Sequence, residues 1–194
     1  NVYYMNGAGN DFMVLDGRGM ALDYEKLSVE LCKRTGADGF MAVDRSDKAD
    51  FRLHFYNSDG TRGEMCGNGA RCISRYGYEK GLAGEVQRIE TTAGLVVGHR
   101  LDTRHYRVRL NDPCNMRFDL PLEVEGAVYS VSYVELGNPG IPHAVVPMEN
   151  LKDYDEADLF SLGRALRYHP AFPKGANVNF YEIIGENHLY ERTY

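Results

Sequence analysis

A cysteine followed by a glycine-rich turn is the part of this sequence best suited to chemistry. Residues 64–72 read Glu-Met-Cys-Gly-Asn-Gly-Ala-Arg-Cys, so that Cys66 is followed directly by Gly67, Asn68 and Gly69. Glycines let the backbone approach a ligand closely. If a helix begins here, its unpaired N–H groups and the positive end of its dipole lie beside the thiol. Such a position lowers the pKa of a thiol and also binds anions such as a substrate carboxylate.

A cysteine in this position could act as a base or as a nucleophile. As a base, its thiolate could remove the Cα proton of a substrate whose carboxylate the loop holds. As a nucleophile, it would ordinarily work beside a histidine, whose place in space the sequence does not reveal. A phosphate-binding P-loop is excluded, because no Gly-Lys-Ser/Thr follows the glycines. The residue types alone leave a functional and a structural role for Cys66 equally open, since many helices begin with such a turn.

The elements that must position this loop are mostly short strands. Residues 50–56 alternate between polar and apolar, as a half-buried strand should, and lead into the turn Asn-Ser-Asp-Gly at 57–60. Apolar spacing and the glycines or prolines beyond predict helices over residues 23–34, 69–79 and 156–168. Many strands with few helices favour an α+β fold over a doubly wound sheet. Further strands are predicted at residues 12–15, 88–91, 95–97, 106–110, 128–134, 144–146, 178–184 and 189–194.

Composition limits the function classes and the partners. The net charge is −6 and no long basic run occurs, which argues against a nucleic-acid partner. No stretch of about 18 apolar residues is present, so we expect no transmembrane helix and no membrane partner. The first residues are too polar for a signal peptide. A polar break at residues 111–113 divides the chain, and we expect one domain over residues 1–112 and another over 113–194.

The four cysteines suggest neither a disulfide framework nor a CxxC metal or redox pair. We therefore expect a reducing, cytoplasmic location and no bound metal. Apart from Cys66, each cysteine is expected to be a small buried hydrophobe, because free cysteines are usually buried. These three residues are Cys32, Cys72 and Cys114.

Five segments, in the same order along the chain, resemble the motifs of the diaminopimelate epimerase family. The nine-residue cysteine signature is the most specific of them. The resemblance covers essentially the whole chain and implies two pseudo-symmetric halves, each a barrel-like mixed sheet around a central helix, with the active site in the cleft between them. The segments are residues 6–12 (NGAGNDF), 55–60 (FYNSDG), 64–72 (EMCGNGARC), 138–145 (NPGIPHAV) and 172–180 (FPKGANVNF).

The resemblance also implies a reaction and roles for single residues. In this family one thiolate removes a Cα proton and a second thiol returns one from the opposite face, without pyridoxal phosphate, metal or nucleotide. LL-diaminopimelate is converted to the meso form for lysine and peptidoglycan synthesis. The resemblance also implies a homodimer. Cys66 would be the first thiol, and His143 the histidine that tunes the cysteines. The small-molecule substrate would be bound by the side chains of Asn10, Asn57, Asn138 and Asn177 and by the backbone amides of Gly67 and Asn68.

Several departures from the family pattern matter. The family has a second cysteine loop past the strand of Asn177, but no cysteine follows Cys114 here. We therefore expect this sequence to be part of a longer chain, with its second half incomplete and inactive by itself. The alternative is a one-base lyase or a non-catalytic amino-acid-binding relative. Glu191 and Arg192 are interpreted as strand residues, not as the family's substrate-binding Glu-Arg pair.

Other departures leave the exact substrate open. Asn6 stands where the family usually has histidine, and Gly39 where some members use a substrate-contacting glutamine. Four residues, Pro-Gly-Ile-Pro, separate Asn138 from His143, so the role of Asn138 is less secure. A racemase for another amino acid on the same fold is thus an alternative. A phenazine-biosynthesis-like isomerase is disfavoured, because those relatives lack the cysteine signature.

Overall fold

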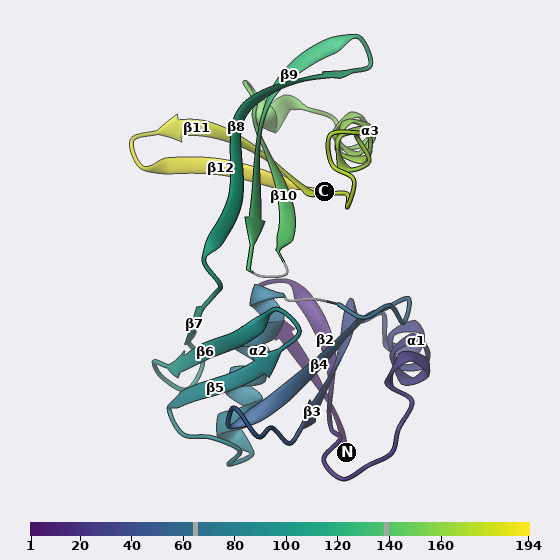
Figure 1. The fold of residues 1–194 in the computed structure, drawn as a ribbon, viewed down its shortest axis with the longest axis vertical. Helices are drawn as coiled ribbons and strands as arrows, with labels where there is room; N and C mark the ends of the chain where they lie inside the picture. Colours follow the sequence, from purple (N-terminus) through teal and green to yellow (C-terminus); the bar gives the residue numbers. More distant parts are fainter. Residues whose placement is uncertain (64–65, 138–139) are drawn as a thin grey trace. The chain divides into compact units, whose positions relative to one another are not determined.

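The chain folds into two compact units, Asn1–Asn111 and Asp112–Tyr194 (Figure 1). The structure is a computed structural model and describes residues 1–63, 66–137 and 140–194. Each unit combines one sheet with helices, so the predicted α+β class is confirmed. Within the described residues, no helix is long and apolar enough to cross a membrane.

The first unit is a curled, seven-stranded mixed sheet around one helix. Its strands lie in sequence order, with parallel pairing between β2 and β3 and between β4 and β5. Helix α2 (Gly67–Glu79) contacts β1, β2, β6 and β7, whereas α1 (Tyr24–Thr35) packs on β3 and β4. The strands are β1 (Val2–Gly7), β2 (Asn10–Asp16), β3 (Gly39–Asp44), β4 (Phe51–Asn57), β5 (Val86–Thr91), β6 (Gly94–Arg100) and β7 (Tyr106–Arg109).

Helix α2 is central because one face of it is apolar and because it carries a glycine where it meets the sheet. Ile73 and Ala70 are almost fully buried in a core with strand residues such as Phe12, Phe51 and Ile89. A Cβ added at Gly77 would lie 2.8 Å from the ring of Phe51, so only glycine lets the helix approach the sheet this closely.

The outer helix α1 ends where the sequence predicts. Asp23 caps its N-terminus by accepting a hydrogen bond from the Lys26 N–H at 3.1 Å. Gly36 ends it in the left-handed conformation, with φ of 76°. Both signals are local, and the predicted helix over residues 23–34 is confirmed.

The second unit is a five-stranded mixed sheet in the order β12-β11-β10-β9-β8, less curled than the first (Figure 1). Only β10 and β11 pair in parallel. Helix α3 (Glu156–Arg167) buries Leu159, Leu162 and Leu166 in the core of this unit, as the sequence predicts. The strands are β8 (Pro113–Val124), β9 (Ala127–Leu136), β10 (Ile141–Pro147), β11 (Asn177–Gly185) and β12 (His188–Thr193), with a short 3-10 helix at Leu151–Asp153.

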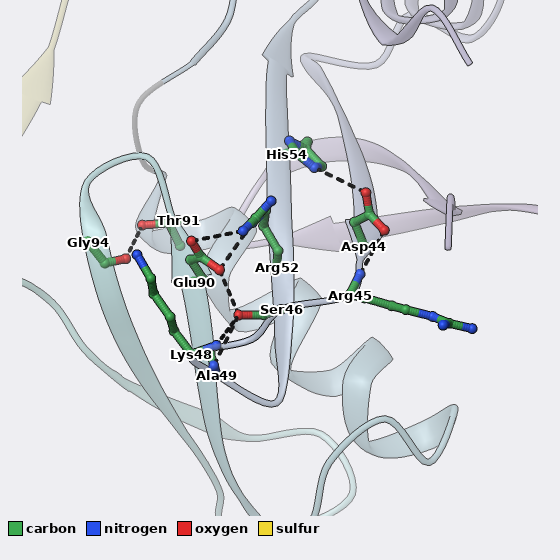
Figure 2. Close-up of polar contacts among 10 residues, drawn as sticks. All are labelled: Asp44, Arg45, Ser46, Lys48, Ala49, Arg52, His54, Glu90, Thr91 and Gly94. Atoms are coloured by element: carbon green, nitrogen blue, oxygen red, sulfur yellow. Dashed lines mark hydrogen bonds and ion pairs between the residues drawn. The ribbon is translucent and has the colours of Figure 1, made fainter. Parts of the chain in front are cut away.

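A polar cluster reinforces the short parallel pairing of β4 with β5 (Figure 2). Glu90 accepts hydrogen bonds from the hydroxyl of Ser46 at 2.6 Å and from Arg52 at 3.2 Å. The pKa of the Glu90 carboxyl is lowered, chiefly by the Ser46 hydroxyl and then by Arg52. The Ser46 hydroxyl also accepts from the N–H groups of Lys48 and Ala49 at 3.0 Å. The cluster thus ties the β3–β4 loop to β5 and fixes β4, which leads into the cysteine loop.

Candidate active site

Cys66 is the N-cap residue of α2, which begins at Gly67, two residues before the predicted start. Its backbone is extended, its carbonyl accepts from the Ala70 N–H at 2.8 Å, and its Sγ accepts from the Gly69 N–H at 3.5 Å. The half-buried thiol therefore lies at the positive end of the helix dipole.

The start of α2 is held against the first strand pair. A Cβ added at Gly7 would lie 2.8 Å from the carbonyl oxygen of Asn68 and 2.7 Å from Sγ of Cys72. Glycine at this position therefore lets the end of β1 lie directly against the first turn of the helix. The motif at residues 6–12 and the cysteine signature thus form one structural unit.

Asn10 and Asn68, both predicted to bind substrate, are hydrogen-bonded to each other. The Asn68 amide donates to Oδ1 of Asn10 at 2.7 Å, and the Asn10 amide donates to Oδ2 of Asp38 at 3.2 Å. The same Asp38 oxygen accepts from the Asp11 N–H at 2.9 Å, and Arg71 donates to Oδ1 of Asn68. Both asparagine side chains are thereby held in place at the first turn of α2.

Asp38 and Arg71 bond to the candidate site residues Asn10 and Asn68, and the sequence did not point to them. Arg71 lies inside the cysteine signature. Asp38 directly precedes Gly39, which is noted above only as a departure from the glutamine of some family members. An aspartate or arginine next to a motif is common, so only the folded contacts identify these two.

The first turn of α2 is suited to holding a carboxylate. The N–H groups of Gly67 and Asn68 belong to the first turn, where a helix supplies no backbone acceptor. Anions bind such groups well, and the helix dipole adds to the attraction. A carboxylate held there would place the adjacent Cα close to the Cys66 thiol.

The other three cysteines have different environments. Burial, and then the neighbouring Cys66, raise the pKa of the Cys72 thiol to about 11, so Cys72 stays a neutral thiol in the core. Cys32 is also buried, and burial raises its pKa. The expected burial is therefore confirmed for both. For Cys114 it is wrong, because this residue lies near the start of β8, which is mostly exposed.

Asn57 is occupied by its own turn. Its side chain donates to the Thr61 hydroxyl at 3.0 Å, and its carbonyl accepts from the Gly60 N–H at 3.0 Å. Among the described residues, no hydrogen bond joins Asn57 to Asn10 or Asn68. A contact between Asn57 and substrate stays a prediction.

In the second unit, His143 and Asn177 lie directly opposite each other on the parallel strands β10 and β11. Arg167 donates to Oδ1 of Asn177 at 3.1 Å, and burial lowers the pKa of the half-buried His143 imidazole. The Asn179 amide nitrogen lies 3.2 Å from Nδ1 of His143. Arg167 and Asn179 were not predicted as site residues. Asn138 lies outside the described residues.

Gly39 begins β3 and lies against the ring of Phe55. A Cβ added at Gly39 would lie 2.7 Å from Cε2 of this ring and 3.0 Å from the carbonyl oxygen of Tyr56. The Phe55 ring also meets Phe12 edge-on, with ring centroids 6.1 Å apart. A glutamine at position 39, as in some family members, does not fit beside Phe55.

Replacing Gly39 by glutamine is expected to lower the free energy of unfolding by about 1–3 kcal/mol, because it overpacks the contact with Phe55. Urea denaturation measures the change. Phe55→Ala opens this space and completes a double-mutant cycle. The double variant should lose less free energy of unfolding than the sum of the two single losses. Additive costs would contradict the proposed steric link.

Comparison with known proteins finds relatives over nearly the whole chain. A family model described as diaminopimelate epimerase matches residues 2–112. Diaminopimelate epimerase from Aquifex aeolicus is 36% identical over 206 residues, which cover 98% of this chain and 71% of the relative. The enzyme of the same name from Archaeoglobus fulgidus is 36% identical over 208 residues, with the same two coverages.

Solved structures show the same fold at lower identity. A Bacillus anthracis phenazine biosynthesis protein of the PhzF family aligns with a TM-score of 0.69 at 18% identity, covering 100% of this chain and 71% of that one. A hydroxyproline epimerase from Agrobacterium vitis aligns with a TM-score of 0.70 at 16% identity, covering 99% and 68%. At such identities the likeness concerns the fold alone.

Proposed function

Because this chain belongs to the diaminopimelate epimerase family, we propose that it serves the epimerisation of LL-2,6-diaminopimelate to the meso form, with Cys66 as one of two acid/base thiols. The observation that carries the proposal is the position of Cys66 at the N-cap of α2, with its Sγ bonded to the Gly69 N–H. A base and an anion site then share one helix end.

The proposed reaction begins with the substrate carboxylate bound by the Gly67 and Asn68 N–H groups. The Cys66 thiolate takes the Cα proton and becomes a thiol, while the electron pair stays on the substrate as a carbanion. The helix end stabilises this developing charge, because its dipoles are already oriented. A second thiol, which the family resemblance implies, returns a proton to the opposite face and becomes a thiolate. No pyridoxal phosphate, metal or nucleotide is needed.

Further residues are proposed to contact the substrate or the reacting thiols. Asn10 accepts a hydrogen bond from the Asn68 side chain and so orients it at the start of α2. His143 is proposed to act on the reacting thiols as a neutral imidazole, since burial lowers its pKa. The remaining proposed substrate contacts are Asn57, Asn138 and Asn177.

Incubating the full-length protein with LL-diaminopimelate in deuterated water tests the proposal. We expect deuterium at Cα together with the meso product, because proton removal and return use solvent-exchangeable thiols. Exchange that leaves the configuration unchanged would indicate a one-base enzyme. The absence of any exchange at high enzyme concentration would rule out the proposed reaction.

A panel of other amino acids tests substrate identity. The departures at Asn6 and Gly39 motivate it, because Asn6 lies in the first of the five motifs and Gly39 stands where some family members use a substrate-contacting glutamine. A higher kcat/KM for proline or another amino acid than for LL-diaminopimelate would favour the racemase alternative.

We also propose a cytoplasmic location and a homodimer. Free thiols at all four cysteines fit a reducing compartment. The dimer rests on the family resemblance alone, and light scattering on the purified protein tests it.

A further inference from the structure

We propose that Asn179 is a positioning residue that fixes which ring nitrogen of His143 carries the proton. The inference rests on the proposed function for its catalytic consequence, but the protonation pattern can be tested separately. Asn179 lies on β11, two residues after Asn177, which pairs with His143. Because side chains alternate along a strand, Asn179 faces the same side of the sheet as His143.

The orientation of the Asn179 amide follows from its neighbours. Its Nδ2 atom lies 3.4 Å from the carbonyl oxygen of Asn177, and a carbonyl only accepts hydrogen bonds. The NH₂ group must therefore point to this side. Its Oδ1 atom lies 3.3 Å from the Thr193 hydroxyl on β12, which is also 3.3 Å from Oε1 of Glu191 and can donate to either oxygen.

This orientation determines the state of His143. The Asn179 NH₂ group lies 3.2 Å from Nδ1 of the imidazole and can only donate, so Nδ1 must be the acceptor. The neutral ring then carries its proton on Nε2. A proton on Nδ1 would place two donors against each other, so that Asn179 would have to turn and lose its bond to Asn177.

The charged groups around His143 do not determine which ring nitrogen carries the proton. Glu191, on β12, acts weakly on the imidazole and favours its protonated form, whereas burial opposes it more strongly. Arg167, from α3, donates to Asn177 and leaves Nδ1 of His143 to Asn179. Asn179 is thus the contact that selects the tautomer, and Nε2–H remains as the donor that His143 offers in the reaction.

Asn179→Asp tests the inference, because aspartate has nearly the same shape but can only accept a hydrogen bond. In the unchanged protein, ¹⁵N NMR of His143 should show a protonated Nε2 and an unprotonated, hydrogen-bonded Nδ1. In the variant, Nδ1 should become protonated. The kcat/KM for LL-diaminopimelate should fall on the order of 10–100-fold, as when the hydrogen-bond partner that orients a metal-bound histidine is removed.

Asn187→Asp is the matched control, because it adds the same charge in the exposed turn between β11 and β12. It should leave both the NMR pattern and kcat/KM unchanged. Should Asn179→Asp fail to fold, Thr193→Val removes the hydroxyl that contacts Oδ1 of Asn179 and Oε1 of Glu191. A mixture of His143 tautomers is then expected.

Two results would overturn the inference. One is a protonated Nδ1 in the unchanged protein, and the other is an Asn179→Asp variant that keeps the Nε2–H pattern or full kcat/KM. If the unchanged protein shows the Nε2–H pattern but has no epimerase activity, the proposed function fails while the assignment of the tautomer to Asn179 stands.

Discussion

The Cys66→Ser variant is expected to lose about 10²–10⁴-fold in the rate of Cα proton exchange, because a serine hydroxyl is a far weaker base than a thiolate. This corresponds to a barrier about 3–5 kcal/mol higher, at about 1.4 kcal/mol for each tenfold change in rate. Deuterium exchange into LL-diaminopimelate and the rate of meso product formation both measure it.

This substitution separates chemistry from folding. Cys66 is the N-cap of α2, and serine is among the preferred N-cap residues because its oxygen accepts from the helix N–H groups. The variant should therefore keep its thermal stability. Wild-type turnover in Cys66→Ser would show that this thiol has only a structural role.

Cys114→Ser is the matched control, since Cys114 is exposed and its Sγ donates to the Gly137 carbonyl at 3.1 Å, a bond that a serine hydroxyl can also make. It should retain full activity. Alkylation gives a second control, because bound substrate should protect Cys66 from iodoacetamide but leave Cys114 reactive.

The Asn10→Asp variant is expected to raise KM for LL-diaminopimelate at least about a hundredfold, because it places a negative charge beside the proposed carboxylate site. Like charges brought together cost several kcal/mol, and about 1.4 kcal/mol corresponds to a tenfold change. Initial rates over a range of substrate concentrations measure KM. The new carboxylate would also face Asp38, whose Oδ2 is 3.2 Å from the Asn10 amide nitrogen.

Exchanging the residue types at positions 10 and 38 distinguishes repulsion of the substrate from repulsion of Asp38. Asn10→Asp combined with Asp38→Asn restores one amide and one carboxylate at this contact, so the Tm should return toward that of the unchanged protein. The negative charge beside Asn68 remains, so KM should stay high. If the swap restored KM as well, Asn10 would act only through the contact with Asp38.

Local signals in the sequence account for much of the fold. The N-cap Asp23 and the stop at Gly36 define α1, and the leucine spacing defines α3, because each depends on residues within a few positions. The alternation over residues 50–56 likewise predicts β4. Glu191 and Arg192 lie on β12, as interpreted from the sequence.

Three strands were not predicted, each for a physical reason. β3 is buried on both faces, so it shows no alternation. β8 is mostly exposed and its pairing with β9 shifts register near Cys114 and Arg117, so it lacks an apolar face along much of its length. β1 is an edge strand that is buried only in part.

By itself the sequence determined the reactive segment, because the cysteine, the glycines and the asparagine of the first turn are consecutive. It did not show that Cys66 itself caps the helix, since that depends on where the first turn closes. Only the tertiary structure joins Asn68 to Asn10, 58 residues away, and Asn10 to Asp38, 28 residues away. The same holds for Asn179 and His143, 36 residues apart. Such contacts depend on strand order and register, which no local pattern encodes.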